Sequence, residues 1–228
     1  LHWRGDLPIQ LIPMNEVDGM IFARIAYLPF EAFDVLHGET SVADAADALL
    51  AADDPDGRIR PKNDVPLLRA LCESGRFGGI AIVGFENKTD TVTQTQFAAV
   101  TLRLPDGSIC ISFRGTDNTL VGWKEDFNMS FVCPVAGQVL AVEYLERTAR
   151  QFPGAGITVL GHSKGGNFAV YAAAFCKAET QAHIRAVYNY DGPGFDDKVL
   201  STEGYKNICE IGKERIRRAG DKIQSEHP

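Results

Sequence analysis

The chain has 228 residues, of which 45% are apolar and 23% charged, and its formal net charge at pH 7 is −7. This length fits one large globular domain, and we expect residues 1–228 to form a single domain. The acidic balance argues against nucleic acid or an anionic membrane as partner, because both bind basic surfaces. The sequence leaves the oligomeric state open.

The first third of the sequence is predicted to be helical. Apolar residues within 15–28 follow helical spacing, and Pro29 ends the pattern. Ser41 is a candidate N-cap for an alanine-rich helix, and Asp64 is a candidate N-cap for the next helix. The region therefore predicts a helical N-terminal layer.

After Gly79 the pattern changes to that of strands. Residues 80–85, 95–104 and 108–115 are rich in β-branched and aromatic side chains. The tripeptide Pro-Asp-Gly at 105–107 predicts a turn that joins the last two runs as an antiparallel hairpin.

From residue 136 onward, predicted helices alternate with buried strands. The expected order is helix 136–151, strand 156–161, helix 165–177 and strand 184–192. Such alternation favours parallel pairing with right-handed crossovers. The predicted fold class is therefore α/β: a mostly parallel sheet of α/β-hydrolase type flanked by helices, with the helical N-terminal layer and an antiparallel edge.

Five cysteines are spread through the chain without a CxxC pair: Cys72, Cys110, Cys133, Cys176 and Cys209. Their spacing favours buried thiols in a reducing compartment over a disulfide framework or a zinc site. No apolar run reaches the ~18 residues of a membrane span. We therefore expect a cytoplasmic protein without an integral membrane segment.

A serine lies between the strand predicted at 156–161 and the helix that follows it. Gly161, Ser163 and Gly165 form G-x-S-x-G, which indicates a nucleophile when it joins a strand to a helix. The sharp turn needs small neighbours and points the hydroxyl beyond the carboxyl end of the strand. The alternative is an ordinary glycine-rich turn in which Ser163 caps the helix. The pattern of a phosphate-binding loop, G-x-x-x-x-G-K-[ST], is absent.

Further motifs carry a family resemblance. With "ISFRGTDNTLVGWKEDF" and "GHSKGG", the sequence resembles the class 3 lipases of the α/β-hydrolase fold. With "WRGDL", "NEVD" and "YNYDGPGF" as well, it is more similar to a bacterial branch of lipase-like hydrolases. The resemblance extends from Trp3 to about Gly204 and implies a serine hydrolase whose oxyanion hole uses the main-chain amides of Thr116 and Lys164. Lys164 replaces the apolar residue common in class 3 lipases, so its side chain either lies in solvent or alters the substrates accepted.

The same resemblance suggests a lid. Residues 117–128 occupy the place where class 3 lipases carry one. Leu120, Val121 and Trp123 would give it an apolar side, and Gly122 a point of flexion. The alternative is that Trp123 anchors the segment in the core.

The acid and the base of a catalytic triad are less well defined. In this fold the chain order is Ser, then Asp or Glu, then His. Asp191 ends the last predicted strand and is the first candidate acid, although it also suits a turn in which it bonds its own backbone. Asp221 is the second candidate, because class 3 lipases often place their acid in a comparable stretch. His227 is the one histidine that follows both acids; either it folds back to serve, or, as we expect, the base lies in a C-terminal segment that this chain lacks.

These observations predict a hydrolase that cleaves carboxylic esters, lipid esters among them, through an acyl-enzyme intermediate. Ser163 would be the nucleophile, Asp191 the acid and His227 the base, with no metal or organic cofactor. The carboxylates of "DGPGFDD" match no calcium-binding loop. The alternatives are a catalytically silent binding protein with the hydrolase fold, and an acyltransferase or thioesterase that uses the same serine.

Overall fold

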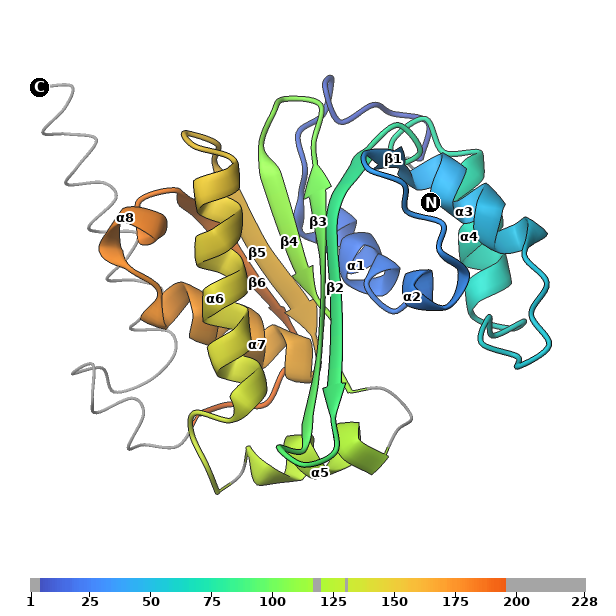
Figure 1. Cartoon of the computed structure of the whole chain (residues 1–228). Coiled ribbons are helices and arrows are strands. Elements are labelled where there is room, and N and C mark those ends of the chain that lie inside the picture. Colours follow the sequence, from blue (N-terminus) through green and yellow to red (C-terminus); the bar gives the residue numbers. More distant parts are fainter. Residues whose placement is uncertain (1–4, 117–119, 130, 196–228) are drawn as a thin grey trace, which may run out of the picture.

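The computed structural model describes residues 5–116, 120–129 and 131–195. In this part of the chain one six-stranded sheet lies between two layers of helices (Figure 1). The strands are β1 (Thr40–Ser41), β2 (Ala81–Asp90), β3 (Thr95–Arg103), β4 (Ile109–Phe113), β5 (Ile157–His162) and β6 (Ile184–Tyr190). The helices are α1 (Glu16–Ile25), α2 (Phe30–Phe33), α3 (Val42–Ala51), α4 (Asp64–Cys72), α5 (Leu120–Asn128), α6 (Ala136–Gln151), α7 (Lys164–Phe175) and α8 (Ala178–Gln181).

Side-chain caps begin two of the N-terminal helices. Asn15 Oδ1 accepts hydrogen bonds from the amides of Val17 and Asp18, at 2.9 and 3.2 Å, and begins α1. Ser41 caps α3, as predicted. The prediction for Asp64 is wrong: it is the first residue of α4 and makes side-chain ion pairs instead of a cap.

The strand pairing confirms the fold class and extends its antiparallel part. The order in the sheet follows the sequence from β1 to β6. β4, β5 and β6 pair in parallel, as the alternating pattern predicts. The other three pairings of the described sheet are antiparallel. The antiparallel portion is therefore larger than an edge.

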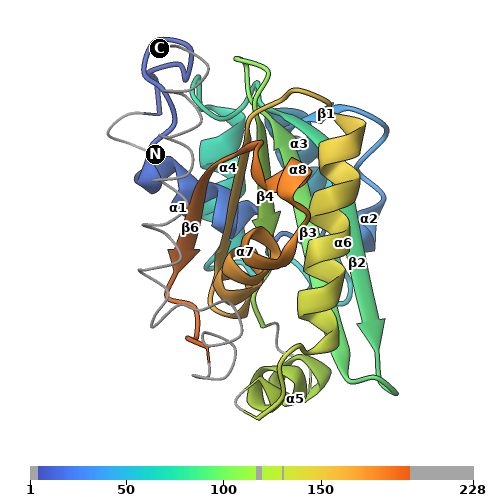
Figure 2. The same cartoon turned by 90° about the vertical axis from the view of Figure 1, so that its left-hand side faces the viewer.

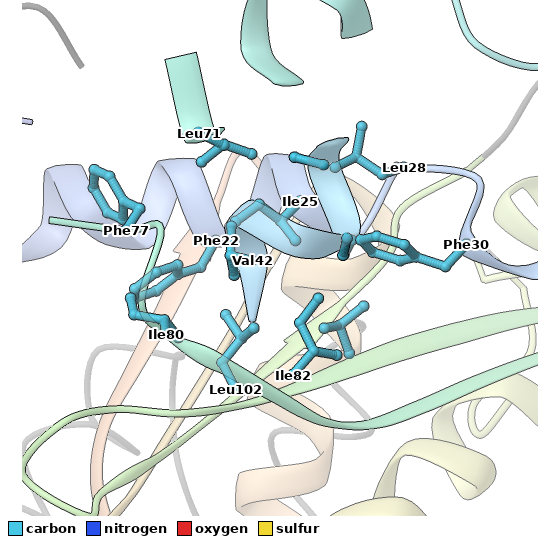
Figure 3. Packing of buried hydrophobic residues seen from close by; sticks show 14 of the residues in the cluster. Phe22, Ile25, Leu28, Phe30, Val42, Leu71, Phe77, Ile80, Ile82 and Leu102 are labelled. Carbon is cyan, nitrogen blue, oxygen red and sulfur yellow. The ribbon is translucent and has the colours of Figure 1, made fainter. Parts of the chain in front are cut away.

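Each face of the sheet carries its own apolar core, because side chains alternate along a strand. In β3, Val100 and Leu102 face α1, α3 and α4, whereas Phe97 and Ala99 face α6 and α7. Figure 3 shows the first core, in which side chains from α1, α3, α4, β2 and β3 point toward one another. The second core fills the space between the sheet and helices α6 and α7.

The parallel strands bring the four predicted site residues that the structure describes to one end of the sheet. Phe113 of β4 pairs with Gly161 of β5, and His162 of β5 pairs with Tyr190 of β6. The segments that follow these strands therefore leave the sheet side by side. α5 lies beyond this end, next to the tip of the β2–β3 hairpin (Figures 1 and 2).

Candidate active site

Ser163 occupies the sharp turn between β5 and α7. Its backbone has φ 55° and ψ −131°, a conformation that residues with a side chain rarely adopt. Its amide donates to the Tyr190 carbonyl at 2.8 Å, which fixes the turn against β6. The side chain makes no capping hydrogen bond to α7. The alternative of an ordinary helix N-cap is therefore wrong, and the hydroxyl is not committed to the backbone of its own helix.

Two glycines permit this turn. A Cβ on Gly165 would lie 2.1 Å from the Phe113 carbonyl oxygen, and one on Gly161 would lie 2.2 Å from the Gly165 carbonyl oxygen. Both distances are far below van der Waals contact, and both obstacles are backbone atoms. Only glycine at these positions lets the start of α7 pack directly on β4 and β5.

The segment after β4 runs beside Ser163. A Cβ built on Gly115 would lie 3.2 Å from Ser163 Cβ and 2.5 Å from the His162 carbonyl oxygen. Gly115 therefore lies close to the serine, and Thr116 is the next residue in the chain. Its Oγ1 is buried and has no hydrogen-bond partner in the described part of the chain. Buried hydroxyls in folded proteins normally have a hydrogen-bond partner, so Thr116 is unusual in this respect.

Arg114 holds this segment in place. Its amide donates to the Ala98 carbonyl at 2.9 Å and continues the pairing with β3. Its guanidinium, almost fully buried, donates to Glu31 Oε1 at 3.1 Å and to Asn87 Oδ1 at 3.0 Å. The strand end next to Thr116 is thus anchored from both its main chain and its side chain.

Tyr27 contacts the same turn from the N-terminal layer. Its Oη lies 2.9 Å from His162 Nδ1 and 2.1 Å from the position of a Cβ on Gly115. Burial raises the pKa of the Tyr27 phenol above its ordinary value, so the hydroxyl stays protonated at neutral pH. Helical spacing identifies the residues around Tyr27 as core positions. Nothing in the sequence signals that its hydroxyl reaches His162.

The side chain of Lys164 lies in an environment that the sequence does not predict. Its side chain is fully buried, and Nζ donates to Glu125 Oε2 of α5 at 2.7 Å. The expectation of a solvated side chain is wrong, because the ammonium is enclosed by protein acceptors. Its backbone still follows Ser163 at the N-terminus of α7, where the helix dipole favours negative charge.

Asp191 follows β6, one residue beyond the pair His162–Tyr190. It is exposed and has a φ of 54°. The turn after β6 is bonded by Asn189, whose Oδ1 accepts from the Gly192 amide at 2.8 Å. Within the described residues, the side-chain hydrogen bond of this turn thus comes from Asn189. Asp221 and His227 lie outside the described residues.

One protein-family model matches the chain. The sequence model described as Mbeg1-like matches residues 71–219, well over half of the chain. The chain belongs to the Mbeg1-like family. The match contains Thr116, Ser163, Lys164 and Asp191 but not His227. No curated protein matches the sequence.

Solved structures of fungal lipases resemble the Mbeg1-like chain in fold. One fungal lipase is 16% identical over 76% of this chain and 60% of its own, with a TM-score of 0.45. A mutant form of MDLA from Penicillium cyclopium is 16% identical over 84% and 67%, with a TM-score of 0.47. The lipase of Rhizopus microsporus var. chinensis is 15% identical over 83% and 62%, with a TM-score of 0.42. This chain thus spans about three fifths of the first lipase, and the likeness concerns the fold alone. The resemblance to a bacterial branch stays a prediction.

Helix α5 of the Mbeg1-like chain occupies most of the segment expected to be a lid. Leu120, Trp123 and Phe127 are 71%, 61% and 67% exposed. The alternative in which Trp123 anchors the segment in the core is therefore wrong. In the part of the chain that the structure describes, no helix has both the length and the apolar character needed to cross a membrane. Movement of α5 as a lid stays a prediction.

Proposed function

We propose that this Mbeg1-like protein is a serine hydrolase that cleaves carboxylic esters, lipid esters among them, through an acyl-enzyme intermediate. One observation carries the proposal: Ser163 lies in a strained turn, its hydroxyl does not cap α7, and the Gly115–Thr116 segment approaches its Cβ. Strained backbone at a strand-to-helix turn is the feature that G-x-S-x-G nucleophiles share.

In the proposed reaction Ser163 Oγ attacks the ester carbonyl. A histidine accepts the serine proton and returns it to the leaving alcohol, and water then cleaves the acyl-enzyme by the same steps in reverse. The amides of Thr116 and Lys164 hold the oxyanion, each contributing about 3 kcal/mol in the transition state. The Thr116 hydroxyl supports this assignment, because it belongs to the same residue as the proposed amide donor and is unpaired among the described residues.

Within this chain we propose His227 as the candidate base, and we keep two candidates for the acid. Asp191 is supported as the acid because it follows β6, the strand that pairs with β5 ahead of Ser163. Its exposure is less favourable, because a triad carboxylate is normally buried and hydrogen-bonded. Asp221 therefore remains its competitor.

The decisive experiment uses a fluorophosphonate probe, which phosphonylates activated serines. We expect labelling of the folded protein that disappears in Ser163→Ala, together with hydrolysis of short p-nitrophenyl esters. Asp191→Asn and Asp221→Asn should differ in kcat. The variant that replaces the catalytic acid should lower kcat by about 10⁴-fold. His183→Gln is the matched control for His227→Gln.

Different outcomes would point to the competing functions. If folded wild-type protein is neither labelled nor hydrolyses esters, the chain is a silent scaffold and the proposal is wrong. Labelling of Ser163 with faster acyl transfer to an added alcohol or thiol than to water would indicate a transferase. Preferred turnover of acyl thioesters over oxygen esters would indicate a thioesterase.

A further inference from the structure

A buried ion pair lies directly beside the proposed nucleophile. Lys164 and Glu125 are 0% and 1% exposed. Lys164 Nζ donates to Glu125 Oε2 at 2.7 Å, to Gln96 Oε1 at 2.8 Å and to the Gln96 carbonyl at 2.9 Å. These three acceptors match the three protons of an ammonium group.

Glu125 is bonded as completely as its partner. Besides Lys164, its Oε2 accepts from the Gln96 amide at 3.0 Å, and its Oε1 accepts from the Gly137 amide at 3.0 Å. One carboxylate therefore joins α5, β3, the first turn of α6 and the first turn of α7. Charges can be buried only when geometry of this quality offsets their desolvation.

The surrounding chain is shaped to admit the carboxylate. A Cβ on Gly137 would lie 2.7 Å from Glu125 Oε1 and 2.4 Å from Phe168 Cζ. Any side chain at position 137 would therefore displace Glu125 or the ring of Phe168. The ion pair and its packing thus require glycine at this position.

The pair acts on the residue whose amide the proposed reaction uses. Lys164 follows Ser163 in the chain, and its side chain is the tether that fixes the first turn of α7 to β3 and α5. We propose that Glu125 is a positioning residue, which, through Lys164, aims the Lys164 amide at the substrate oxyanion and holds α5 as a fixed wall of the site. This inference rests on the proposed function.

The ion pair restricts the movement of α5. Moving this helix away as a lid would break the contacts of Glu125 with Lys164, Gln96 and Gly137 and leave a buried ammonium without its counter-charge. The exposed apolar residues of α5 therefore remain on its solvent-facing side, and Glu125 remains on its buried side.

The test uses Glu125→Gln, Lys164→Met and the uncharged double variant Glu125→Gln/Lys164→Met. The matched control is Asp18→Asn, which disrupts a second buried ion pair, Asp18–Arg76, in the N-terminal layer. For each variant kcat and KM for a short p-nitrophenyl ester are measured per folded molecule, with Ser163 counted by fluorophosphonate titration. Urea unfolding and hydrogen exchange of residues 120–128 and 163–168 are measured in parallel.

We expect Glu125→Gln to lower kcat by about 10- to 100-fold with KM changed less than about threefold, because small misplacement of a catalytic group costs this much. The double variant should regain stability relative to the single variants, since no charge is left unpaired, but its kcat should stay low. Hydrogen exchange should accelerate in α5 and at the start of α7. Asp18→Asn should lower stability and leave kcat per folded molecule unchanged.

The results separate this inference from the proposed function. If wild-type protein is active and Glu125→Gln or the double variant keeps wild-type kcat per folded molecule, the pair is purely structural and the inference is overturned. Unchanged exchange of α5 in Glu125→Gln would also overturn it. If folded wild-type protein is neither labelled nor active, the proposed function fails and the inference fails with it.

Discussion

At the scale of single residues, the backbone of Ser163 is the feature that sets the site apart. Among the described residues other than glycine, only Asp34, Gln94, Ser163 and Asp191 have positive φ. Asp34, Gln94 and Asp191 do not join a strand to a long helix, whereas Ser163 links β5 directly to α7. Its ψ of −131° also places it outside the left-handed helical region that asparagine and aspartate tolerate. A side chain held in this conformation costs about 1–3 kcal/mol, which the packing around it must offset.

This strain gives a prediction with an unusual sign. Glycine normally destabilises a protein by about 0.5–1 kcal/mol relative to alanine. At position 163 we expect the opposite: Ser163→Gly should be more stable than Ser163→Ala by about 1 kcal/mol, because glycine relieves the strain. Urea unfolding of both variants measures the difference, with Ala48→Gly in the regular helix α3 as the control that should lose stability. A Ser163→Ala variant that is the more stable of the two would contradict the argument.

Single residues also mark the limit of what the sequence predicts about the site. The position of Ser163 could be predicted, because the motif itself determines the local backbone. The burial of Lys164 could not, because its partners Glu125 and Gln96 lie 39 and 68 residues away in the chain. Tyr27 reaches His162 across 135 residues, and its spacing only identifies a core-facing helix. Contacts made by the fold between distant residues leave no local pattern.

At the scale of elements, the helices of the N-terminal layer are joined by an ion cluster rather than by caps alone. Asp64, at the start of α4, is fully buried. Its Oδ2 accepts from the amide and Nε of Arg60 at 2.9 and 3.0 Å, and Arg24 of α1 binds its Oδ1. An aspartate near a predicted helix start is read from the sequence as a cap. The sequence does not show whether its side chain caps the helix or forms a buried ion pair. The short elements α2 and α8 were missed for a similar reason, since four residues are too few for a periodic pattern.

Asp64→Asn should make stability less dependent on pH. Burial raises the pKa of the Asp64 carboxyl, but hydrogen bonds from Arg60 and the charges of Arg60 and Arg24 outweigh it and leave the pKa lowered. A lowered pKa in the folded state contributes stability above the unfolded value of about 3.9, and this contribution is lost as pH falls through the folded pKa. We expect the variant to be about 2–4 kcal/mol less stable at pH 7.

Urea unfolding at several pH values tests this expectation. The difference between wild type and Asp64→Asn should be constant from pH 7 to about pH 5 and should shrink below about pH 4. Asp47→Asn, on the exposed side of α3, serves as the control and should change stability little. A difference that grows as the pH falls would show that the sign of the argument is wrong.

At the scale of the whole molecule, one sheet supports two cores. Strand residues alternate between the core with α1, α3 and α4 and the core with α6 and α7 (Figure 1). The α/β class and the order of the long elements could be predicted, because alternation and helical spacing are local properties. The extent of the antiparallel part could not, since pairing of β2 with β1 depends on a two-residue strand. Because β3, β4 and β5 contribute to both cores, neither core can lose its structure without exposing the other side of the same strands.

We therefore expect the described chain to unfold as a single cooperative domain. Phe22→Ala removes a fully buried ring from the first core, and Leu145→Ala removes a fully buried side chain from the second. Each should lower the free energy of unfolding by about 3–5 kcal/mol and shift one common transition, in which circular dichroism and tryptophan fluorescence coincide. Val92→Ala, at a position 89% exposed in the β2–β3 hairpin, should leave the transition unchanged. If Phe22→Ala instead produces two transitions, one of them at the wild-type midpoint, the N-terminal layer is a separate unit and the shared sheet does not couple the cores.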